Sequence, residues 1–172
     1  MKLSLLIIAL VAVAAVTRAG ADDKVKTVAS FTKGTVSLTQ GGTAIKWQLK
    51  NGEITSMSMT IGGKPTEVLS YHLSYWEDGS PRSTNSHRVE ITLMNVKGAG
   101  KYTKDNVMVF SVMSKQGTST HRSSKGTDCA FELTKADEKG ITGTATCKGD
   151  FVDFNGKPGA PKIEDVKFDS AP

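Results

Sequence analysis

Residues 43–50 read TAIKWQLK, and in this stretch isoleucine, tryptophan and leucine alternate with lysine and glutamine. A period of two predicts a β-strand that buries one of its faces. Asn51-Gly52 follows directly, and this dipeptide favours the positive backbone angles of a type I′ hairpin turn. The stretch therefore predicts a strand that turns back into a second strand, residues 53–61.

The same alternation recurs along the chain, interrupted by glycine-containing turns such as Gly62-Gly63. No window has the apolar spacing of an amphipathic helix. Antiparallel strands on short turns, without crossover helices, predict an all-β fold: a single antiparallel β-sandwich of about ten strands, Ig-like or jelly-roll-like, with a barrel as the alternative. The expected strands are 28–31, 35–39, 43–50, 53–61, 66–76, 87–94, 106–113, 128–134, 140–148 and 163–170.

Residues 1–21 have the features of a secretory signal peptide. Lys2 precedes an apolar run of about 14 residues, and Ala19-Gly20-Ala21 offers small residues for cleavage. The alternative is a membrane anchor, which needs about 20 apolar residues. Cleavage leaves residues 22–172 as one domain and lowers the formal net charge from +5 to +3, because Lys2 and Arg18 are removed. The predicted destination is the periplasm or the extracellular space.

The two cysteines are expected to form one disulfide across a hairpin. Folding 128–134 back on 141–147 aligns large side chains with small ones. Directly opposed Cα atoms lie about 4.5–5.5 Å apart, which a disulfide can span. The alternatives are a redox pair or a metal site, but the sequence has no C-x-x-C motif. The expected opposed pairs are Leu133–Gly143, Phe131–Ala145 and Cys129–Cys147.

This hairpin also carries a resemblance to a known group of proteins. Its sequence is DCAFELTKADEKGITGTATCKG at 128–149, followed by IEDVKF at 163–168. It resembles the ending of many small exported bacterial β-sandwich proteins, mostly uncharacterised, in which a strand pair precedes a final strand that closes on an aromatic residue. The resemblance implies a β-sandwich fold, export and a bacterial origin, and it implies no catalytic residues.

Motifs for catalysis, metal binding or cofactor binding are missing from the sequence. Strand parity sets His72 and His87 on opposite faces of a sheet, and His121 lies in a polar segment, so solvated histidines are expected rather than a zinc site. Met57 and Met59 share a strand face and are expected to fill the core rather than to bind copper. The sequence thus predicts no cofactor, no metal and no catalytic residue.

Two segments without acidic residues, 97–104 and 114–126, are the candidate binding loops. If they gather at one end of the sandwich, they form a basic, hydroxyl-rich rim that suits an anionic glycan, a lipid head group or an acidic envelope protein. Trp76 lies on the face opposite Tyr71 and Tyr75, and it is the aromatic candidate for a surface role. The candidate binding residues are Lys97, Lys101, Lys104, Lys115, His121, Arg122, Lys125 and Trp76.

The composition, 38% hydrophobic and 23% charged, excludes disordered, collagen-like and coiled-coil classes. Nucleic acid is disfavoured as a partner because the mature charge is small and the basic segments lack interleaved aromatic residues. The leading hypothesis is an exported, non-enzymatic protein that binds a ligand or partner through its end loops. The alternatives are a small exported hydrolase and a structural component of the envelope or surface.

Overall fold

The computed structural model describes residues 26–76, 86–122 and 128–171, and all regular elements in these ranges are β-strands. In the described ranges no helix has the length and apolar character needed to cross a membrane. The proposed leader, residues 1–21, lies outside them.

The strands form two antiparallel sheets, so the predicted all-β sandwich is confirmed and the sheets do not close into a barrel. The large sheet has eight strands in the spatial order β1 (Lys26–Phe31), β4 (Asn51–Ile61), β5 (Lys64–Trp76), β6 (Ser86–Met94), β8 (Val107–Ser114), β9 (Gly117–Arg122), β12 (Phe151–Val152) and β13 (Pro158–Ala160). The small sheet has six strands in the order β3 (Thr43–Gln48), β2 (Lys33–Gln40), β14 (Ile163–Ala171), β11 (Gly140–Lys148), β10 (Asp128–Asp137) and β7 (Gly100–Tyr102).

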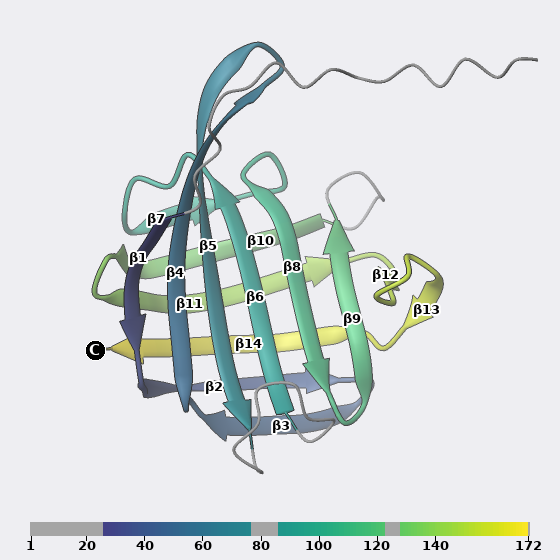
Figure 1. The fold of residues 1–172 in the computed structure, drawn as a ribbon. Coiled ribbons are helices and arrows are strands. Elements are labelled where there is room, and N and C mark those ends of the chain that lie inside the picture. The colour runs from purple at the N-terminus through teal and green to yellow at the C-terminus, as the bar shows by residue number, and fades with distance from the viewer. Residues whose placement is uncertain (1–25, 77–85, 123–127, 172) are drawn as a thin grey trace, which may run out of the picture.

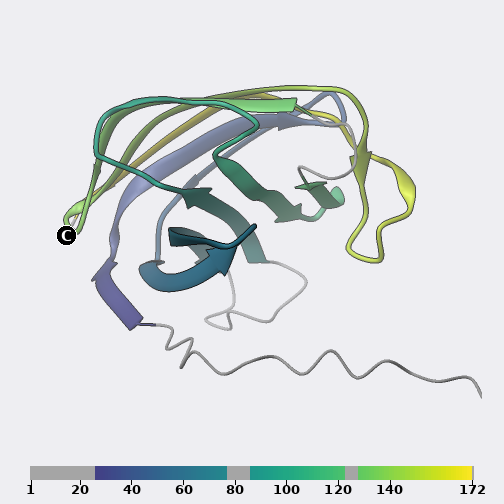
Figure 2. The same cartoon turned by 90° about the horizontal axis from the view of Figure 1, so that it is seen from above.

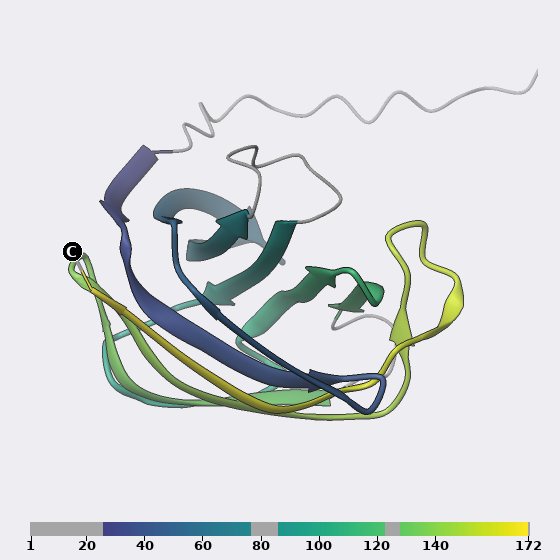
Figure 3. The same ribbon diagram turned by 90° about the horizontal axis from the view of Figure 1, so that it is seen from below.

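The two sheets face each other with their strands crossed. Figure 1 shows the strands of the large sheet running from top to bottom, in front of the strands of the small sheet, which run across the view. Figures 2 and 3, seen from above and from below, show the small sheet curving around one side of the large sheet. This is the orthogonal way of packing two sheets, in which bends and bulges carry the chain from one sheet to the other.

The hydrophobic core lies between the sheets. The alternation in β5 and β6 is confirmed there, because Tyr71, Leu73, Val89 and Ile91 are fully buried and Tyr75 packs against them from the margin. Two aromatic rings join the layers: Phe131 of β10 meets Phe110 of β8 edge-on, with ring centroids 5.4 Å apart. Phe131 also packs against Phe168 of β14, with centroids 6.2 Å apart.

Strand β14 occupies the interior of the small sheet. It pairs with β2 on one side and with β11 on the other. A bulge at Asp165, which has a positive φ of 53°, shifts the register with β2 between Glu164 and Lys167. The early strands β2 and β3 are therefore joined to β10 and β11 only through β14.

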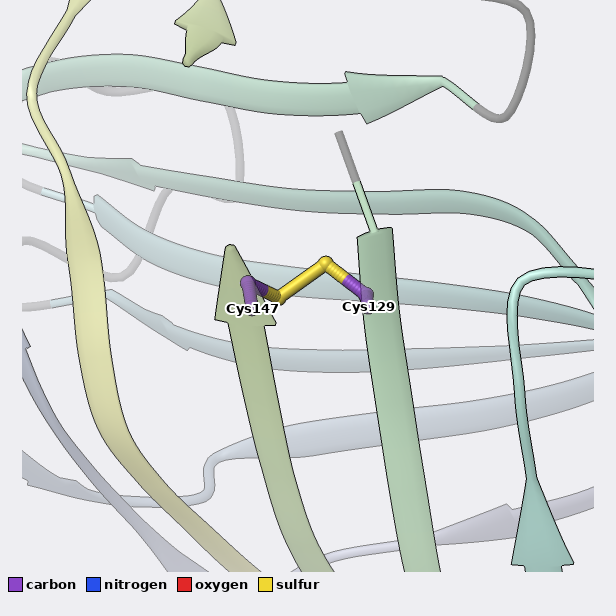
Figure 4. The surroundings of a disulfide bond; sticks show 2 residues. All are labelled: Cys129 and Cys147. Atoms are coloured by element: carbon purple, nitrogen blue, oxygen red, sulfur yellow. A yellow bond between two sulfur atoms is a disulfide. The ribbon is translucent and has the colours of Figure 1, made fainter. Parts of the chain in front are cut away.

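The predicted disulfide hairpin is confirmed (Figure 4). Strands β10 and β11 pair in the expected register, with Phe131 opposite Ala145 and Cys129 opposite Cys147. The cysteines form a disulfide, and their Cα atoms are 4.1 Å apart. A bulge after Leu133 absorbs one residue before the turn. The size complementarity of the two strands therefore predicted their register correctly.

The predicted hairpin at Asn51-Gly52 is wrong. Both residues belong to β4, neither has the positive φ that a type I′ turn needs, and the chain passes here from the small sheet to the large one. Gly52 faces the interior, where a side chain on it would overlap the ring of Phe31. The glycine therefore leaves room for a core aromatic. The turn predicted at Gly62-Gly63 does exist, between β4 and β5, and both glycines have positive φ.

The methionines are not part of the buried core, contrary to expectation. In β4, Gly52 and Ile54 face the core, and Ile54 pairs with Tyr71. Met57 and Met59 have the other parity and are half-buried on the outer side of the sheet. The error arose because β4 carries apolar residues on both faces, and period two does not say which of the two faces is inside.

Candidate functional site

The lysines expected to form one rim lie in different places: Lys101 is in β7 of the small sheet, and Lys115 is in the turn after β8 of the large sheet. Lys97, Lys101 and Lys104 belong to the connection between β6 and β8, whereas Lys115 lies in the turn after β8. The eight residues of β8 lie between these places, a length of about 25 Å at the usual rise of a strand. Lys101 is also engaged, because its Nζ lies 2.7 Å from Oε1 of Glu132. The side chains of Arg122 and Trp76, and all of Lys125, lie outside the described residues.

The segment 114–122 is a strand hairpin and not the loop that was expected. Gln40 of β2 is fully buried and reaches across to this hairpin. Its Nε2 donates to Oγ of Ser119 at 2.9 Å, and its Oε1 accepts a hydrogen bond from Oγ of Ser114 at 2.6 Å. The Ser119 hydroxyl donates in turn to the carbonyl oxygen of Pro161 at 2.7 Å. These serines therefore tie the two sheets together and are not available to a ligand.

His121 was expected to be solvated, and this is wrong. It pairs with Phe110 on the inner face of β9 and is completely buried. Neither of its ring nitrogens has a hydrogen-bond partner among the described residues. Burial lowers the pKa of His121, and Asp128 opposes that shift only in part. The side chain is thus neutral and structural, and it is removed from the set of candidate binding residues.

We expect His121 to make the protein less stable in acid. Its pKa is lower in the folded chain than in the unfolded chain, where it is about 6.5, so below that pH the unfolded state binds the proton first. The free energy of unfolding then falls by at most about 1.4 kcal/mol per pH unit for this group. Thermal unfolding followed from pH 7.5 to 5 should show a smaller acid loss in His121→Leu than in the wild type.

The matched control for this prediction is His72→Gln. Burial also lowers the pKa of His72, so this variant shows how much of the acid loss comes from a histidine on the outer face of the large sheet. An unchanged pH dependence in His121→Leu would contradict the prediction.

His72 and His87 lie on opposite faces of the large sheet, as strand parity predicted. His87 faces inward and stacks between Trp47 and Tyr75, with ring centroids 5.2 and 5.9 Å away, so the expectation that this histidine is solvated is wrong. His72 faces outward with Ser74. Within the described ranges, no group of three or more histidine, cysteine or acidic side chains is placed to hold a metal ion.

A depression of about 310 Å³ lies beside the disulfide, at the end of β10 and β11. Lys104, one of the candidate residues, meets Lys148 there. Asp105 and Asp128 line the same depression, so its formal charges balance. It is consequently a surface hollow with no excess of positive charge.

The outer face of the large sheet carries a row of polar side chains that the sequence did not reveal. Its members come from five neighbouring strands and stand directly opposite one another, because the strand register aligns them. Thr27 donates to Oε1 of Glu53 at 2.8 Å, and Ser111 and Thr120 share a hydrogen bond of 3.0 Å. The row consists of Glu53 of β4, His72 of β5, Glu90 of β6, Ser111 of β8 and Thr120 of β9.

Arg88 of β6 is the centre of two shallow depressions on this face. One has a volume of about 210 Å³ and is lined by Asn51, Glu53, His72, Ser74 and Arg88. The other has a volume of about 80 Å³ and is lined by Arg88, Glu90, Ser111, Met113, Thr118 and Phe154. We call the two depressions together the outer-face site.

Hydrogen bonds and charge determine how Arg88 and His72 are oriented. Nη2 of Arg88 lies 3.0 Å from Nδ1 of His72 and 3.8 Å from Oε2 of Glu90. Since a guanidinium can only donate, Nδ1 accepts, and the proton of the neutral ring is on Nε2. Burial lowers the pKa of His72; Glu90 and Glu53 raise it and Arg88 lowers it, but the net shift is downward. The site thus has two carboxylates, one guanidinium and a neutral imidazole.

Phe154 borders the outer-face site and is 75% exposed, more than any other large hydrophobic residue in the described ranges. It lies in the turn between β12 and β13, which Asp153 holds in shape. Oδ1 of Asp153 accepts hydrogen bonds from the backbone N–H groups of Asn155 and Lys157, both at 2.8 Å. The ring is therefore presented to solvent by a turn with a fixed backbone.

Sequence reasoning missed Phe154, although one signal was available. The residues around it, Asp153, Asn155 and Gly156, are typical turn formers, and a phenylalanine among them has no strand face to pack on. Met113, which is 40% exposed, lies beside it on β8. Two exposed apolar side chains next to a polar depression are a common feature of binding sites.

Comparison with protein-family models, curated proteins and solved structures finds no match for this chain.

Proposed function

We propose that the chain is exported to the periplasm or beyond, after cleavage of residues 1–21. The apolar leader supports this proposal, and so does the Cys129–Cys147 disulfide, because disulfides persist in oxidising compartments. A free cysteine is not found among the described residues.

Its role in this proposal is non-enzymatic binding, and the binding surface is the outer-face site rather than the end loops. The observation that carries it is the convergence of donors and acceptors from β4, β5 and β6 on Arg88, beside an exposed aromatic ring. Ligand sites usually combine a few precisely placed polar groups with apolar or aromatic side chains. Arg88 is also oriented before a ligand arrives, since His72 holds one of its nitrogens.

Two specific observations favour other functions. Lys104 and Lys148 both line the depression beside the disulfide, where Asp105 and Asp128 balance their charge, and these two lysines keep an anionic glycan, a lipid head group or an acidic envelope protein as the second candidate partner. Glu53 and Glu90 stand on either side of His72, and glycoside hydrolysis needs two carboxyl groups across a site, which keeps a small hydrolase as the alternative activity.

One binding experiment separates these functions. The secreted protein is titrated with three probes: a mixture of neutral oligosaccharides, a heparin hexasaccharide, and vesicles that contain phosphatidylglycerol. We expect at least one probe to bind, and Arg88→Ala to weaken that binding about tenfold or more, the effect of losing one charge-assisted hydrogen bond. The matched control, Lys104→Ala with Lys148→Ala, should bind as the wild type does.

Three results would contradict the proposal. The first is that no probe binds, and the second is that binding depends on the two lysines and not on Arg88. The third is that an oligosaccharide probe is cleaved and that Glu53→Gln stops the cleavage, which would make the protein a hydrolase.

A further inference from the structure

The two depressions of the outer-face site follow one line across the large sheet. They share Arg88, and their lining residues come in turn from β4, β5, β6, β8 and β9. Four inter-strand spacings of about 4.8 Å make this line about 19 Å long. Phe154 lies at its far end, next to Met113. An elongated ligand can therefore contact the polar groups and the aromatic ring at the same time.

The polar groups along this line match hydroxyl groups. Carboxylates at Glu53 and Glu90 only accept hydrogen bonds, the guanidinium of Arg88 only donates, and the amide of Asn51 does both. Planar groups of this kind can bridge two neighbouring hydroxyl groups, each of which both donates and accepts. The hydroxyl groups of Ser74 and Ser111 add further hydrogen-bond donors and acceptors to the outer-face site.

The charges of the outer-face site disfavour a charged ligand. Two carboxylates stand against one guanidinium, and the imidazole of His72 is neutral, so the formal charge is negative and repels phosphate, sulfate and uronate groups. Arg88 lies at the centre, where it would repel an ammonium or a second guanidinium. A ligand without charge avoids both repulsions.

Phe154 adds an apolar surface at one end of the site. The face of an aromatic ring is electron-rich and attracts the weakly positive C–H groups that line one side of a sugar ring. Because Asp153 fixes the turn, the backbone that carries Phe154 loses little conformational freedom when a ligand stacks on the ring.

We propose that the outer-face site binds an uncharged, polyhydroxylated ligand, a neutral oligosaccharide that lies across the strands and stacks one ring on Phe154. This inference rests on the proposed function, because it names the class of ligand for the same site.

The test uses calorimetric titration of the secreted protein with a panel of neutral oligosaccharides: gluco-, manno-, xylo- and chito-oligosaccharides at millimolar concentration. We expect at least one to bind, and Phe154→Ala to weaken it about tenfold, which corresponds to about 1.4 kcal/mol. Phe154→Trp should keep the affinity. Ile61→Ala, at another exposed apolar residue far along the β4–β5 hairpin, should leave it unchanged, and Arg88→Ala should weaken it.

The possible failures can be told apart. If the heparin hexasaccharide or the anionic vesicles bind in an Arg88-dependent way while no neutral oligosaccharide does, the site is a binding site but the ligand class is wrong. If a neutral oligosaccharide binds equally well to Phe154→Ala, the stacking arrangement is wrong and the inference is overturned. If no probe depends on Arg88, the proposed function itself fails.

Discussion

Replacing Phe131 by alanine is expected to lower the free energy of unfolding by about 3–5 kcal/mol, because a fully buried aromatic side chain is lost and a cavity is left behind. The position of Phe131 between the sheets places the expected loss in the upper part of this range. Phe131 contacts Phe110 in the large sheet and Phe168 in the small sheet, so the cavity would open between the two layers. Denaturant unfolding of the wild type and the variant measures the difference.

Two controls make this prediction specific. Phe154→Ala makes the same chemical change at a position that is 75% exposed, and it should alter stability by no more than about 0.5 kcal/mol. Phe131→Leu keeps much of the volume and should cost less than Phe131→Ala. Equal losses in Phe131→Ala and Phe154→Ala would contradict the burial of Phe131 between the sheets.

Removal of the disulfide is the second large effect. The double substitution Cys129→Ser with Cys147→Ser opens a loop with a sequence separation of 18 residues. In the chain-entropy model, such a loop stabilises the folded state by about 3 kcal/mol, because it restricts the unfolded chain. The melting temperature of the double variant should fall accordingly, as measured by thermal unfolding.

A reductant provides the matched control for that effect. The wild type in dithiothreitol should lose about the same stability as the double variant, and the double variant should not respond to the reductant. If the double variant is as stable as the oxidised wild type, the disulfide does not stabilise the fold.

Local features were predictable from the sequence where two independent signals agreed. In β10 and β11, the cysteine positions and the matching of large with small residues indicated the same register, and that register is observed. The inward faces of β5 and β6 were also predictable, since Tyr71, Leu73, Val89 and Ile91 share one face and the opposite face of these strands is mostly polar. Gly62 and Gly63 have no neighbouring atoms where a side chain would stand, and they form the predicted turn.

Features that depend on long-range contacts were not predictable. Gly52 looks like a turn residue until Phe31, far away in the sequence, is known to fill the space beside it. His121 and Ser119 look solvated because their partners in space, the interior of the sandwich and Gln40, come from other strands. Period two indicates which residues share a face, but it does not indicate which strands become neighbours.

The outer-face site was missed for the same reason. Glu53, His72, Glu90 and Ser111 are far apart in the sequence, and they form a row only because β4, β5, β6 and β8 pair in one register. Lys97 and Lys115 show the opposite error, in which residues expected to lie together are far apart in the structure. They were grouped because their segments have similar composition, and β8 separates them.

The position of β14 has a consequence for how the protein is made. The chain emerges from its amino end, so β2, β3, β10 and β11 are all synthesised before residues 163–171. Until then the small sheet exists only as two separate pieces, and the large sheet has no complete layer to cover its apolar face. Folding of the sandwich is therefore delayed until its central strand is synthesised, and a chain interrupted before residue 163 cannot join its two halves.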